Sequence, residues 1–232
     1  MYTKTEKKQF IIFLLLAYGL TYVMGLLMWY GNASGMDVSA FPNAQMMYPA
    51  AGVALAYLIT GKKEQKLPKG FYAVFFILTV IMAEIAVVST FVKLPTMGTA
   101  EASISAWTLL IQGMLIIGSI LCWIALIASG KERRKNGGLR WKNTGASVVC
   151  VLLFFIIYML RNAISYALSG QIGTLLNVFA QPYTWINLAA LIPNFFLVFT
   201  AFFGEENGWR YYMQPYLQRK FGQRGGVILL GI

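Results

Sequence analysis

The sequence has 232 residues, of which 58% are hydrophobic and 12% are charged, and its formal net charge is +11. Soluble globular domains contain roughly 25% charged residues, so this composition excludes an ordinary soluble domain and indicates a membrane protein. The apolar runs are continuous rather than alternating, which disfavours strands and predicts an all-α transmembrane helix bundle. We expect one membrane-embedded helical domain over residues 1–232.

Successive apolar runs predict six membrane-spanning helices and the start of a seventh. Most runs are close to the roughly 20 residues that a spanning helix needs, and the second is the shortest. The predicted spans are Phe10–Tyr30, Ala44–Thr60, Phe71–Phe91, Ile104–Ser129, Ala146–Leu168 and Thr184–Phe203. A further apolar run, GGVILLGI, follows Gln223 and reaches Ile232, which is less than half of a span. We therefore expect these residues to belong to a longer chain that continues through this helix.

Basic residues are concentrated in alternate loops. They lie in the leader, in the GKKEQKLPKG and GKERRKNGGLRWK loops and after the sixth predicted span, whereas the other loops carry only Lys93. Because basic residues are retained on the cytoplasmic side, this pattern predicts a multi-pass protein of the cell membrane with a cytoplasmic N-terminus. The same charges suit anionic lipid headgroups. Their spread over four short loops provides no single stripe for nucleic acid, so we predict no nucleic-acid partner.

The stretch GEENGWRYYMQP, residues 204–215, places charges directly after the sixth predicted span. In a continuous helix Glu206 and Arg210, four residues apart, share a face and can pair, while Glu205 points about 140° away from Arg210. A carboxylate that the arginine does not neutralise is a candidate proton acceptor. Charges at the end of a spanning helix also commonly serve as simple interface anchors, so position alone does not decide between these interpretations.

The string EENGWRYYMQPYLQRKFG resembles the first signature of the CPBP family, the CAAX and bacteriocin-processing intramembrane proteases. That signature consists of two adjacent glutamates, three residues and an arginine, and it is matched here by Glu205, Glu206 and Arg210. Trp209, directly before the arginine, also agrees with bacterial members of the family. The resemblance is specific over about residues 200–232 and only architectural before them. It implies that the region from about 180 to 232 is the start of the family's catalytic region.

This resemblance implies hydrolysis of peptide bonds in a membrane-associated peptide or protein. By analogy, Glu205 activates a water molecule, while Glu206 and Arg210 support its geometry. The family also supplies histidines from two later helices, whereas these 232 residues contain none. Without an imidazole the chain lacks both a neutral-pH acid/base partner and a nitrogen ligand, so zinc is implied by the family label only. We expect these residues alone to be inactive as a hydrolase.

Two alternatives remain open. The missing histidines equally fit a non-catalytic membrane protein that binds a peptide or confers bacteriocin immunity. Glu84 and Arg161 lie at similar depths in the third and fifth predicted spans and would suit a transporter, although a structural ion pair is the simpler interpretation. Asn194, about three turns before Glu205 on the same predicted face, suggests a polar seam along the sixth helix or an interhelical contact.

Overall fold

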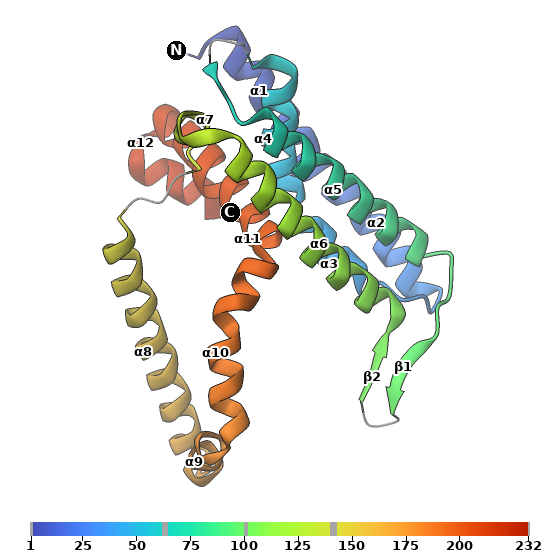
Figure 1. The fold of residues 1–232 in the computed structure, drawn as a ribbon, viewed down its shortest axis with the longest axis vertical. Coiled ribbons are helices and arrows are strands. Elements are labelled where there is room, and N and C mark those ends of the chain that lie inside the picture. Colours follow the sequence, from blue (N-terminus) through green and yellow to red (C-terminus); the bar gives the residue numbers. More distant parts are fainter. Residues whose placement is uncertain (1, 62–64, 100–101, 140–142, 232) are drawn as a thin grey trace. The chain divides into compact units, whose positions relative to one another are not determined.

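Helices form almost all of the regular structure in the computed structural model, as the composition predicts (Figure 1). The structure describes residues 2–61, 65–99, 102–139 and 143–231. Contacts divide the chain into two compact units, a larger one of residues 1–138 and 197–232 and a smaller one of residues 139–196.

The larger unit begins with a continuous helix, Lys4–Ala33, of 30 residues. It consists of α1 (Lys4–Leu14), a π-helical segment η1 (Leu15–Leu20) and α2 (Thr21–Ala33). A capping box starts it, because the Thr3 side chain accepts a hydrogen bond from the Glu6 N–H and the Glu6 carboxylate accepts one from the Thr3 N–H. This helix contains the whole of the first predicted span and is long and apolar enough to cross a membrane.

The second predicted span, Ala44–Thr60, is divided between two helices. α3 (Ala40–Gln45) and α4 (Tyr48–Thr60) are separated by two methionines. The 13 residues of α4 reach only about 20 Å, short of the roughly 30 Å of hydrocarbon in a bilayer. The predicted single span is therefore replaced by a broken helix.

α4 forms the centre of the larger unit. Every residue from Tyr48 to Ala54 is buried, and most of them are alanine or glycine. These small side chains let α1 approach closely, since a Cβ added at Gly52 would lie 3.1 Å from the Cα of Phe13. The apolar residues at the start of α4 are therefore buried against protein, whereas the sequence predicted only that the run spans the membrane.

The third and fourth predicted spans correspond to α5 (Lys69–Ser89) and α6 (Ala106–Ala128), which lie side by side (Figure 1). Both are long and apolar enough to cross a membrane. Between them, β1 (Thr96–Thr99) and β2 (Ala102–Ser105) form an antiparallel hairpin that the sequence did not predict. Ile104 consequently belongs to a strand, and the helix starts two residues later than predicted.

The basic loops of the larger unit gather at one end. The side-chain amide of Gln9 donates to the Thr60 hydroxyl at 2.7 Å, which places the end of α4 beside the beginning of α1. Lys66, after α4, pairs with Glu132 at 3.0 Å in the short helix α7 (Gly130–Asn136) that follows α6. The broken helix of α3 and α4 therefore returns the chain to the end at which it began.

At the opposite end, the loop after α2 is fastened to the start of α6. Asp37 accepts hydrogen bonds from the Ser39 N–H, at 2.8 Å, and from the hydroxyl of Ser105, which is the N-cap of α6. Burial raises the pKa of the Asp37 carboxyl, but the hydrogen bonds from Ser105 and Ser39 outweigh it and hold the pKa below its ordinary value.

The smaller unit contains α8 (Thr144–Leu168), α9 (Ile172–Ala180) and nearly all of α10 (Pro182–Leu197). α8 corresponds to the fifth predicted span and is long and apolar enough to cross a membrane. α9 and α10 meet at an angle of 72°, and they are long and apolar enough to do so only when taken together as a bent pair. Within the described residues, these three helices contain no buried side chain. In the part of the chain that the structure describes, four helices are therefore suited to cross a membrane, or five if the bent pair is one span.

Candidate functional site

The two glycines of the GEENG stretch hold the candidate site against the larger unit. A Cβ at Gly204 would lie 2.3 Å from the carbonyl oxygen of Met46, and one at Gly208 would lie 2.2 Å from the Cβ of Pro49. Side chains at these positions would clash, so α11 (Phe199–Glu206) and the π-helical segment η3 (Asn207–Met213) pack directly on the start of α4. Small residues four apart are typical of close helix packing in membranes. We call this contact the glycine seam.

The three candidate site residues are exposed. Nε of Arg210 lies 2.9 Å from Oε2 of Glu206, with 72% and 57% of the two side chains exposed. The predicted pairing is therefore confirmed. Glu205 is also exposed and makes no ion pair with any other described residue, so the arginine leaves its carboxylate free. An exposed pair of this kind contributes only about 0–1 kcal/mol to stability, so stability is a weak reason for its presence.

Arg210 lies in a π-helical segment that the sequence did not predict. Such segments are rare and occur frequently at functional sites. The other π-helical segment, η1, contacts it through aromatic side chains: the rings of Tyr18 and Trp209 are 5.3 Å apart, and the Tyr18 hydroxyl lies 3.8 Å from the sulfur of Met213. Phe13, one residue before the end of α1, meets Trp209 edge-on at 5.7 Å. These contacts fix the segment that carries Arg210.

Two buried polar atoms of the segments that form the glycine seam have no hydrogen-bond partner among the described residues. They are the hydroxyl of Tyr48, at the start of α4, and Oδ1 of Asn207, which lies between the two seam glycines. Tyr48 is fully buried and Asn207 is 6% exposed. Leaving such a group unpaired costs about 1–3 kcal/mol. Sequence reasoning missed both residues, although Asn207 stands inside the charged stretch that it singled out.

A partly polar cavity of about 370 Å³ lies beside the same segment, between α1, α4 and the helix α12 (Gln214–Gly231) that follows η3. Tyr211 and Tyr212, which directly follow Arg210, line it together with Glu6 and Arg219. Burial raises the pKa of both tyrosine hydroxyls, so they remain protonated and able to donate hydrogen bonds at neutral pH. The only sequence signal for this cavity is the pair of tyrosines after the arginine.

The predicted polar seam from Asn194 to Glu205 assumed one continuous helix, and that assumption is wrong. Asn194 belongs to the smaller unit, so the seam itself stays a prediction. The helix is interrupted at Val198, whose φ of −112° and ψ of 20° lie outside the helical region, and α11 begins only after it. Pro193 lies within α10 and does not end that helix. Because the two residues lie on different helices, the 100° spacing that placed them on one face does not apply.

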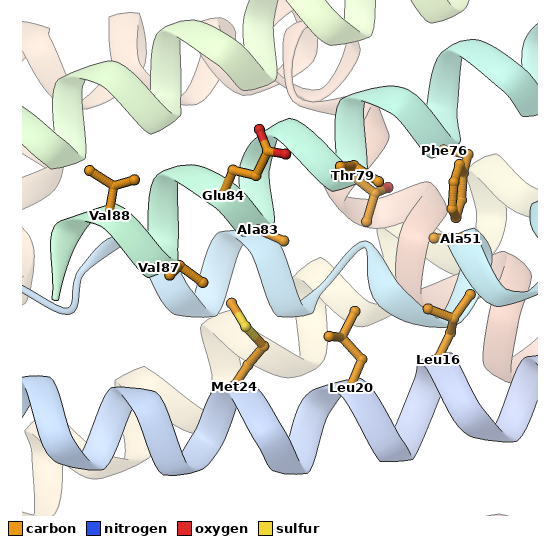
Figure 2. A pocket seen from close by; sticks show the side chains of 11 residues that line it. Leu16, Leu20, Met24, Ala51, Phe76, Thr79, Ala83, Glu84, Val87 and Val88 are labelled. Atoms are coloured by element: carbon orange, nitrogen blue, oxygen red, sulfur yellow. The ribbon is translucent and has the colours of Figure 1, made fainter. Parts of the chain in front are cut away.

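An apolar cavity of about 390 Å³ lies between the first helix and α5 (Figure 2). Leu20 and Met24 line one side, and Thr79 and Glu84 contribute to the other. Figure 2 shows the Glu84 carboxylate pointing away from Leu20 and Met24. Arg161 belongs to the smaller unit, so the predicted pairing of these two charges stays a prediction.

The described residues do not fit a zinc site. They contain no group of three or more histidine, cysteine or carboxylate side chains close enough to hold a metal ion. Structural zinc sites use four such ligands and catalytic sites use three, so Glu205 and Glu206 alone are insufficient. Cys122 is buried in α6, Cys150 is exposed on α8, and both are free thiols.

Comparisons with protein-family models, with curated proteins and with solved structures give no match. Support for a function therefore comes from the residues of the site. The feature to be explained is an exposed carboxylate, Glu205, next to an ion pair on a helical segment that the glycine seam holds in place.

Proposed function

We propose that this protein supplies the glutamate and arginine residues of a CPBP-type intramembrane endopeptidase. The observation that carries the proposal is the ion pair between Arg210 and Glu206, which leaves the adjacent Glu205 without a cationic partner among the described residues. A second support is that Glu205, Glu206 and Arg210 all match the family signature. The substrate class that follows is a membrane-associated peptide or protein.

In this mechanism Glu205 is the general base. Its carboxylate accepts a proton from a water molecule as the water attacks the carbonyl carbon of the scissile peptide bond. Arg210 neutralises Glu206, so Glu206 adds little repulsion when Glu205 is ionised. The glycine seam holds this helical segment, and hence the base, at a fixed position.

Protonation of the leaving amine requires a general acid, which in the family is attributed to histidine-bearing helices. These 232 residues contain no histidine. The proposal therefore concerns the activity of a form of the protein that includes such helices. No step is assigned to a metal, because the described side chains provide no adequate ligand set.

We also propose a cytoplasmic N-terminus. The hydrogen bond between Gln9 and Thr60 supports this orientation, because it brings the basic leader and the basic loop after α4 to the same end of the larger unit. Basic loops are retained on the cytoplasmic side. The six-span count remains part of this proposal, with the pair α3 and α4 serving as a broken second span.

A second candidate function is binding without hydrolysis, as in an immunity protein. The absence of histidine from the sequence favours it. In that case the partly polar cavity beside Tyr211 and Tyr212 would bind a peptide, and Glu205 would have no chemical role.

Profiling of new peptide N-termini in membranes distinguishes the two functions. The protein is expressed from its own locus as the natural form and as Glu205→Gln. Cleavage products that require the natural form should disappear in Glu205→Gln at equal protein level. Glu132→Gln is the matched control, because it also removes one exposed carboxylate, 65% exposed, outside the site. If no cleavage product depends on Glu205, the protease proposal fails and binding without hydrolysis is left.

A further inference from the structure

The first turns of α1 are fastened to α12 by an aromatic cluster. The ring of Tyr216 stacks with Tyr2 at 4.1 Å and with Phe10 at 3.9 Å, and both pairs are within 6° of parallel. The Tyr2 hydroxyl also donates a hydrogen bond to the backbone carbonyl of Tyr216. Residues that are more than 200 positions apart in sequence therefore form one surface at the end of the unit that carries the basic loops.

The charges on this surface are only partly neutralised. Arg219 pairs with Glu6 at 2.8 Å, and its guanidinium lies 5.0 Å from the centre of the Tyr2 ring. Lys7 and Lys220 are exposed and form no salt bridge with an acidic side chain among the described residues. Two ammonium groups are thus left beside the aromatic cluster.

Both lysines line the same groove, of about 380 Å³. Most of the remaining lining is aromatic or aliphatic and includes Phe10, Ile11 and Phe221. Ile11 is 57% exposed, and it belongs to the helix Lys4–Ala33, which is long and apolar enough to cross a membrane. The groove therefore combines positive charge with an apolar wall at the start of a membrane-spanning helix.

We propose that this groove binds one anionic phospholipid, with its phosphodiester between Lys7 and Lys220 and the upper part of an acyl chain against Phe10 and Ile11. Lysine is a common phosphate ligand and attracts anionic lipids at the cytoplasmic surface. The apolar wall distinguishes this occupant from nucleic acid or free phosphate, which have no chain to bury. The proposal does not depend on the protease function.

Native mass spectrometry of the full chain, titrated with phosphatidylglycerol or with phosphatidylcholine of the same acyl chains, tests this site. We expect phosphatidylglycerol to bind more tightly. Each lysine near an anionic surface contributes about fivefold in affinity. The double variant Lys7→Gln/Lys220→Gln should therefore weaken phosphatidylglycerol binding roughly 25-fold. Because both lysines are exposed, thermal unfolding of the variant should match that of the natural protein.

The matched control is Lys4→Gln/Lys8→Gln, which removes the same charge from exposed positions outside the groove. It should change binding less than about twofold. An equal loss in this control would overturn the proposal, because attraction would then be non-specific. The proposal is also wrong if phosphatidylcholine binds equally well, or if inorganic phosphate displaces the lipid at millimolar concentration. Ile11→Asn should weaken lipid binding, and unchanged binding would refute the chain position.

Discussion

Replacing Gly208 by alanine tests the packing that fixes the candidate site. The added methyl group would lie 2.2 Å from the Cβ of Pro49 and 2.6 Å from its carbonyl carbon. Proline ring and backbone atoms cannot rotate away, so the segments must separate. Overpacking of this kind costs about 1–3 kcal/mol, whereas exchanging glycine for alanine in a helix otherwise gains up to about 1 kcal/mol. We expect a net loss of about 1–2 kcal/mol in the free energy of unfolding.

The assay is unfolding of the purified protein in mixed micelles with increasing denaturing detergent. Gly113→Ala in α6 is the control, since nothing lies within 4 Å of a Cβ at that position. The control should be as stable as the natural protein or more stable by up to about 1 kcal/mol. If Gly208→Ala is as stable as Gly113→Ala, the close contact between η3 and α4 is not present and the reasoning about the glycine seam is wrong.

Three further predictions concern single side chains. Arg210→Ala should cost less than about 1 kcal/mol in unfolding free energy because its ion pair is exposed, but it should lower the proposed proteolysis; a larger loss of stability would show that the pair is structural. Tyr48→Phe removes a buried hydroxyl without a partner among the described residues, so stability should be unchanged or higher by about 1 kcal/mol, and a clear loss in the same unfolding assay would contradict this. Asp37 has a lowered pKa, so its stabilising contribution is present above its ordinary pKa of about 4 and is lost as pH falls through the lower folded value. Protection of the amides at the start of α6 against hydrogen exchange, relative to their intrinsic exchange rates, should therefore fall in acid, and Asp37→Asn should abolish this difference. If Asp37→Asn shows the same loss of protection in acid as the natural protein, another group causes that loss.

The long helices and the ion pair could be predicted from the sequence because each depends on local spacing. An apolar run of 20 or more residues has few alternatives to a helix, which is why α5, α6 and α8 lie close to their predicted bounds. The pairing of Glu206 with Arg210 needs only a spacing of four residues in a helix. Both depend little on the rest of the fold.

The features that were missed depend on contacts between distant segments. The run that contains α4 is apolar in the same way whether it faces lipid or protein, so hydropathy alone could not reveal that α4 is central and short. The hairpin of β1 and β2 has only four residues in each strand, too few for a clear alternation. The break at Val198 and the two π-helical segments have no accepted sequence signature, so helical spacing was extended through them.

The role of Glu205 is tested most directly by the turnover of a cleaved substrate with Glu205→Gln and Glu206→Gln, each in a form of the protein that contains histidine-bearing helices. General-base catalysis typically contributes 10²–10⁴-fold to the rate, so the turnover rate of Glu205→Gln should be at least about 10²-fold lower, at unchanged stability. Glu206→Gln should lose less, because it only releases Arg210 from its ion pair. Turnover by Glu205→Gln within about tenfold of the natural protein, below the general-base range, would contradict the assignment of the base.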